Sequence, residues 1–142
     1  APSAEGRRKI VLATSIADSS ITGEGGRVVE LPSSTAQEVM RTIIARDEGA
    51  ARLGEVALVD NEGRIGALDT VFYDTLLDEN AASHIALGRA FPFLAGDDET
   101  AGMMNESDIH IDFMIGSDEL TVHGVTRDGE RVPVLVGGAW QI

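Results

Sequence analysis

The chain has 142 residues, of which 24 are acidic and 11 are basic, a formal net charge of -13, and no cysteine. Its length suits one domain with its own hydrophobic core, so we expect residues 1–142 to form a single domain. The negative charge argues against nucleic acid and membrane surfaces as partners. Without cysteine, any metal must be held by oxygen and imidazole nitrogen. No apolar run approaches the roughly 20 residues of a membrane helix and no leader pattern is recognisable, so we predict a cytoplasmic location.

The first half of the chain predicts two strands and one main helix. Residues 9–13 and 27–31 are β-branched runs near turn-prone glycines, and we expect these two strands to pair. Ser33 and Ser34 are candidate helix caps. Apolar residues then recur at helical spacing, which predicts a helix over about 35–48 that packs onto a sheet.

The second half predicts short strands. Glu55 precedes an apolar run over 56–59 that ends at the turn-prone residues 60–63. An antiparallel C-terminal meander is expected, with a hairpin turn at Asp128 and Gly129. Its four expected strands are 109–115, 120–125, 132–136 and 139–142. Strands, one helix and more strands predict an α+β fold with a mixed or antiparallel sheet.

Candidate metal ligands fall within this pattern. His110 and Asp112 are two residues apart in an alternating apolar run, so a strand would place both on one face. His84 lies among small residues, where a lone histidine is usually structural. Together with Glu55, however, these side chains form a donor set that suits zinc, cobalt or manganese. Sequence spacing alone does not bring Glu55, His84 and His110 together.

Other polar residues are weaker candidates. Asp78 and Glu79 could orient the imidazole of His84, although charges beside Asn80 also suit a solvated turn. His123 has no carboxylate at ligand spacing, and we interpret it as a surface or structural residue.

Four segments resemble the metallo-aminopeptidase family that includes aminopeptidase T and aminopeptidase S. They are GEVALV, LLDENAASHIALGRAFP, NESDIHIDFMIGS and GVTRDGERVPVLVGGAW, and the resemblance covers about residues 27–142. It implies the C-terminal, metal-carrying part of a longer peptidase, one or two divalent cations per chain, peptide substrates and a homodimer. The implied metal ligands are Glu55, His84, His110 and Asp112, with Glu55 also the implied catalytic residue.

The chain departs from the family pattern at two ligand positions. The family tyrosine is replaced by Phe91, which has no phenolic oxygen. The position of a second family glutamate falls on Arg8, or on Glu5 after a shift of three residues. A cation in a cation site would weaken metal binding.

Residues 6–22, GRRKIVLATSIADSSIT, separately look like a motif from the second domain of DEAH-type helicases. A helicase activity is excluded, because the sequence has no G-x-x-x-x-G-K-S phosphate loop or DEAH box.

Two functions from different classes follow from the resemblance. The leading prediction is a metal-dependent aminopeptidase that hydrolyses N-terminal peptide bonds with a metal-activated water. The alternative is a catalytically impaired relative that serves as a binding or oligomerisation module, which the two departures favour. A structural metal site without an open coordination position is a third reading.

Overall fold

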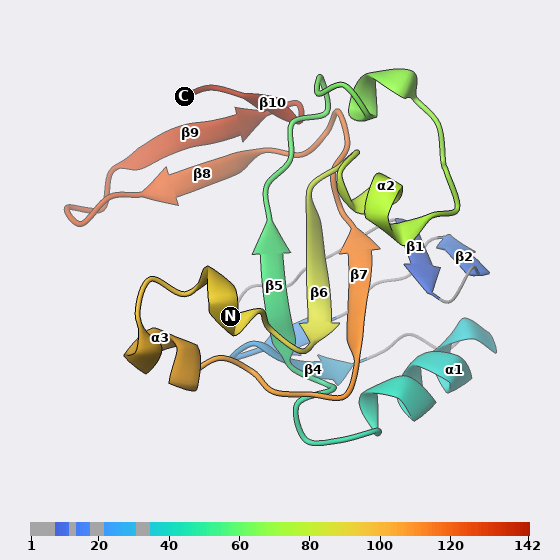
Figure 1. Cartoon of the computed structure of the whole chain (residues 1–142). Helices are drawn as coiled ribbons and strands as arrows, with labels where there is room; N and C mark the ends of the chain where they lie inside the picture. The colour runs from blue at the N-terminus through green and yellow to red at the C-terminus, as the bar shows by residue number, and fades with distance from the viewer. Residues whose placement is uncertain (1–7, 12–13, 18–21, 31–34) are drawn as a thin grey trace.

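A computed structural model describes residues 8–11, 14–17, 22–30 and 35–142. Three antiparallel strands stand side by side at its centre (Figure 1): β5 (Leu53–Ala57), β6 (His84–Gly88) and β7 (His110–Met114). The main helix, α1 (Thr35–Ile44), lies below them, and the C-terminal hairpin extends to the opposite side. This arrangement confirms the α+β class.

The remaining strands form three smaller antiparallel sheets. β1 (Arg8–Val11) pairs with β2 (Thr14–Ala17), and β3 (Thr22–Glu24) pairs with β4 (Arg27–Glu30). The C-terminal sheet has the order β10-β9-β8, with β8 (Val122–Val125), β9 (Arg131–Val136) and β10 (Ala139–Trp140). Short helices lie in the connections: α2 (Thr75–Glu79), α3 (Asp98–Gly102), and the 3-10 turns η1 (Gly66–Leu68) and η2 (Pro92–Leu94).

The central sheet has one apolar face, which explains where α1 lies. Phe113 of β7 and Leu87 of β6 form a buried cluster with Met40 of α1. Ile43 and Ile44 of the same helix pack against this cluster. Because side chains alternate along a strand, the residues between these core positions point to the opposite face of the sheet.

Two pairing predictions were wrong. Strands 9–13 and 27–31 do not pair with each other, because β1 and β4 each form a hairpin with their own sequence neighbour. The predicted strand 109–115 is β7, which belongs to the central sheet and not to the C-terminal meander. Local hairpins close short loops, and the loop-closure entropy they require is small. The remaining three strands form the predicted meander, and Gly129 takes a left-handed φ of 86° in the turn between β8 and β9.

The main helix ends four residues earlier than predicted, at Ile44. The carboxylate of Asp47 explains this, because it accepts the amide of Ala50 at 2.8 Å and the amide of Asp108 at 2.9 Å. These bonds turn the chain away from the helix axis and hold it against the segment that enters β7. Within the described part of the chain, no helix has the length and apolar character needed to cross a membrane.

Candidate metal centre

The second face of the central sheet gathers all four predicted ligands. Glu55 of β5 and Asp112 of β7 both pair with Ala86 of β6, so the two carboxylates project from the same side in one row. His84 lies two residues before Ala86 on β6, and His110 lies two residues before Asp112 on β7. The methyl group of Ala86 leaves the space between the carboxylates open to the longer side chains around it.

The carboxylate of Glu55 lies between the two imidazoles. Its Oε1 is 3.6 Å from His84 Nε2, and its Oε2 is 3.3 Å from His110 Nε2. The same nitrogen of His110 lies 3.1 Å from Asp112 Oδ1. Donor atoms of Glu55, His110 and Asp112 all fall within 4.8 Å of one another, and His84 joins them at the other oxygen of Glu55.

Backbone carbonyls hold both imidazoles in the orientation that metal binding requires. His84 Nδ1 lies 3.1 Å from the carbonyl oxygen of Ala82, and His110 Nδ1 lies 2.6 Å from that of Arg89. Because a carbonyl oxygen only accepts, each Nδ1 carries the proton and donates it. In the neutral ring, the Nε2 lone pair is then directed at the cluster, as in histidines that ligate metals.

This donor set fits a divalent cation of intermediate softness. It offers imidazole nitrogen and carboxylate oxygen without thiolate, which suits zinc, cobalt or manganese. His84 and Asp112 are each only 5% exposed. Burial of a negatively charged group without a compensating cation is unfavourable, so a cation would relieve this arrangement.

Asp78 and Glu79 do not orient the imidazole of His84, since the carbonyl of Ala82 occupies its Nδ1. The carboxylate of Asp78 is buried and instead accepts the amides of Phe72 and Asp74, which fixes the start of α2. Glu79 lies close enough to the ligand candidates for their charges to affect its pKa. Burial raises the pKa of Glu79, and the neighbouring carboxylate of Asp112 raises it further. Glu79 was predicted as a partner of His84, and its position near Asp112 was not predicted.

Phe91 lies against the centre without contributing a ligand atom. Its ring centroid is 4.6 Å from that of His110, with the two planes tilted by 42°. Of the two candidate positions for a second glutamate, Glu5 lies outside the described residues. Arg8 begins β1, which contacts β7, but the side chain of Arg8 is also outside the described part.

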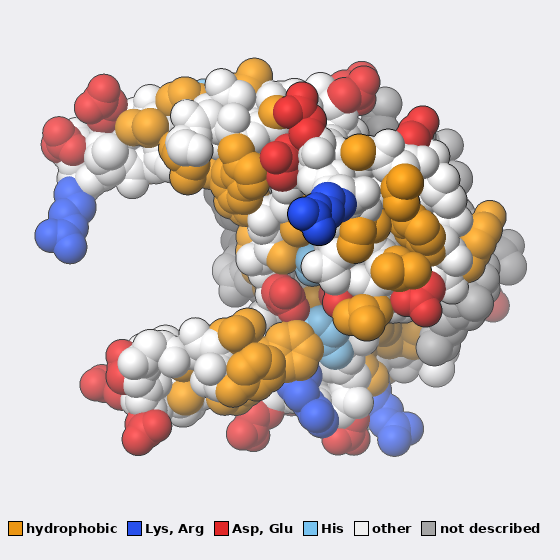
Figure 2. Space-filling view, turned by 45° about the horizontal axis from the view of Figure 1, so that its top comes forward, with side chains coloured by type: hydrophobic (Ala, Val, Ile, Leu, Met, Phe, Trp, Pro, Cys, Tyr) orange, Lys and Arg blue, Asp and Glu red, His pale blue; other side chains and the backbone are white. Residues whose placement is uncertain are grey.

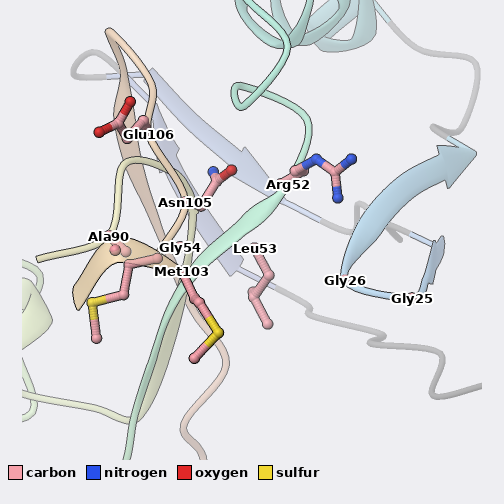
Figure 3. A pocket seen from close by; sticks show the side chains of 11 residues that line it. Gly25, Gly26, Arg52, Leu53, Gly54, Ala90, Met103, Asn105 and Glu106 are labelled. Carbon is pink, nitrogen blue, oxygen red and sulfur yellow. The ribbon is translucent and has the colours of Figure 1, made fainter. Parts of the chain in front are cut away.

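Figure 2 shows a broad hollow on one face of the molecule, with histidine and acidic side chains at its inner wall. A separate pocket of about 730 Å³ lies beside the first residues of β5 (Figure 3). Leu53, Met103 and Asn105 are among its lining residues, which include none of the four ligand candidates. The metal centre is therefore distinct from this pocket.

Imidazole and carboxylate donors converge on one face of a small antiparallel sheet, so the α+β fold carries a candidate site for a divalent cation. Comparison with protein families agrees with this interpretation, because the sequence profile of the family described as thermophilic metalloprotease (M29) matches residues 7–140. The chain therefore belongs to this metalloprotease family. The match begins further toward the N-terminus than the resemblance over 27–142, and it takes in most of the helicase-like stretch.

Characterised relatives carry aminopeptidase names. The chain is 46% identical over 124 residues to aminopeptidase T of Thermus aquaticus. This alignment covers 84% of this chain and 30% of that relative. It is 37% identical over 127 residues to aminopeptidase AmpS of Bacillus subtilis, covering 84% of this chain and 31% of the relative. The chain thus spans about a third of the length of the curated relatives it matches.

A solved structure shares the fold. Wild-type AmpT from Thermus thermophilus superposes with a TM-score of 0.83 at 42% sequence identity, over 96% of this chain and 35% of that one.

Proposed function

We propose that this chain is the metal-binding part of an aminopeptidase, with Glu55, His84, His110 and Asp112 as the metal ligands. One observation carries the proposal: two imidazoles, each held through Nδ1 by a backbone carbonyl, direct Nε2 at opposite oxygens of the Glu55 carboxylate. Such an arrangement could hold one or two cations. The aminopeptidase names of relatives in the same family support the reaction class.

The ligand residues also suggest how the reaction would proceed. When bound, a divalent cation would polarise the scissile carbonyl and lower the pKa of an attacking water. Glu55 would accept the proton of that water and return it to the departing amino group, as a general base and then a general acid. The substrates would be peptides with a free N-terminus. A homodimer and a cytoplasmic location stay predictions.

The ligand assignment is tested by metal content. After dialysis against zinc and then zinc-free buffer, elemental analysis should find one or two zinc ions per chain. His84→Ala and His110→Ala should each weaken zinc binding by roughly a hundredfold or more, since each removes a ligand atom. His123→Ala is the matched control, because His123 is exposed on β8. Unchanged zinc content in both ligand variants would refute the assignment.

A second candidate function is a binding module that retains the fold and lacks hydrolytic activity. Phe91 favours it, because its ring occupies a place beside His110 without supplying an oxygen. Hydrolysis of an N-terminal amino-acid amide by the zinc-loaded protein would distinguish the two. A protein with stoichiometric zinc and no hydrolysis would support the binding module.

A further inference from the structure

An aromatic series leads from the metal centre to solvent. The ring of Phe91 contacts the imidazole of His110, and the ring of Phe93 lies with its centroid 5.5 Å from that of Phe91, tilted by 45°. Both distances are in the range of favourable aromatic contacts. The metal ligand His110 is thus joined to the surface through two apolar rings.

The outer end of this series is open. Phe93 is 79% exposed and the next residue, Leu94, is 67% exposed. We name Phe91, Phe93 and Leu94 the apolar platform. Figure 2 shows hydrophobic surface beside the histidines at the edge of the hollow. Apolar surface exposed next to a reaction centre is typical of a ligand contact, because covering it removes apolar area from water.

The backbone under the platform is fixed. Pro92 begins η2, and the amides of Leu94 and Ala95 donate to the carbonyls of Phe91 and Pro92 at 3.0 Å each. Upstream, the amide of Ala90 donates to the carbonyl of Asn105 at 2.9 Å. The platform is therefore preorganised, and a ligand that contacts it does not have to order this segment.

The distances match a peptide in the centre. An extended chain advances about 3.3–3.6 Å per residue, so a peptide with its scissile bond at the ligands reaches Phe93 within its first residues. The carboxylates of Glu55, Asp112 and Glu79 disfavour an acidic side chain there.

We propose that the apolar platform contacts an apolar side chain within the first two residues of the peptide substrate and so selects for it. This inference rests on the proposed peptidase function and adds a substrate class to it. The contact is made by side chains that do not coordinate the metal, so selectivity and metal binding can be altered separately.

The test compares two tripeptides with free N-termini, Leu-Leu-Gly and Ser-Ser-Gly. Binding to the zinc-free protein is measured by calorimetry, NMR shifts of the Phe93 ring in the wild type locate the contact, and kcat/KM is measured on the zinc-loaded protein. We expect Leu-Leu-Gly to be preferred roughly tenfold or more in both measurements, the usual effect of an apolar contact. In Phe93→Ser the preference should fall to about threefold or less. Leu94→Ser should show a smaller loss, and Val125→Ser should show none.

Val125 is the matched control because it is 70% exposed, close to the value for Leu94, and lies on β8 of the C-terminal sheet. Equal preference in the wild type and Phe93→Ser, or no shift of Phe93 with either peptide, would overturn the proposal. So would a change in subunit association of Phe93→Ser, seen by sedimentation, without a change in peptide preference. If the zinc-loaded protein is inactive while Phe93 still discriminates between the peptides, the peptidase function fails and the platform stands.

Discussion

The carboxyl group of Glu79 ends α2 beside the metal centre, where burial and then the charge of Asp112 raise its pKa above the ordinary value of 4.5. A raised pKa in the folded state means that ionisation opposes folding. The folded protein carries no such penalty below pH 4.5, where the carboxyl is protonated in both states. As the pH rises through the folded pKa, the penalty appears in full.

Glu79→Gln should therefore raise the melting temperature of the metal-free protein at pH 7 and leave it almost unchanged at pH 4. Glu130→Gln is the control, because it removes the same formal charge from an exposed position near the β8–β9 turn. Thermal unfolding of the three proteins at both pH values measures the effect. Equal melting temperatures of wild type and Glu79→Gln at pH 7 would contradict it.

Individual site residues differed in how far the sequence could place them. His110 and Asp112 could be placed on one face because they share a strand and a period of two. Their contact with Glu55 depends on the register with β6, which a single sequence does not specify. The carbonyls of Ala82 and Arg89, which orient the imidazoles, were not predictable, since every residue has a carbonyl.

At the level of elements, β6 determines the geometry of the centre, and its last residue is the most constrained. Gly88 has a φ of 96°, and it pairs with His110 across the sheet. A Cβ at Gly88 would collide with the carbonyl of Ile109. Its own carbonyl accepts the side-chain amide of Asn105 at 2.6 Å.

Gly88→Ala should destabilise the protein by about 1–3 kcal/mol and weaken metal binding through the displacement of His110. Gly129→Ala offers a close control, because Gly129 has a φ of 86° with nothing within 4 Å of a Cβ. It carries the backbone strain without the collision. Urea unfolding should place Gly88→Ala below Gly129→Ala in stability; the reverse order would show that the collision is relieved by local movement.

Elements with a clear period were the easiest to predict. The helix could be predicted from its apolar stripe, but its end could not, because Asp47 bonds to Asp108, 61 residues away. The central strand β6 was missed, since His84, Ala86 and Gly88 on one face do not look like a strand. The small residues Ala86 and Gly88 leave room for the side chains of the metal-ligand candidates, and they weaken the sequence pattern that would predict a strand.

At the scale of the whole molecule, the formal net charge of -13 means that repulsion between carboxylates opposes folding, so cations in general should stabilise the folded state. Monovalent salt screens the repulsion between surface carboxylates. A divalent cation at the proposed centre would bind the folded state through groups that are dispersed in the unfolded chain, so its binding free energy would add to stability.

Zinc at a hundred times its dissociation constant should raise the free energy of unfolding by about 2.7 kcal/mol, and a chelator should remove the gain. Calorimetry at constant ionic strength measures this shift. The double variant His84→Ala, His110→Ala should show little or none of it. An equal shift in that variant would mean that zinc acts through the surface carboxylates.

Ligands and core residues alternate along β6, since Ile85 and Leu87 face α1 while His84 and Ala86 face the centre. Deleting or inserting a single residue within this strand would exchange its two faces, burying an imidazole and exposing a leucine. Substitutions can therefore alter one face at a time, whereas changes of length affect both at once. Variation in chain length should be tolerated in exposed connections, such as the turn at residues 126–130 between β8 and β9, and not within the three central strands.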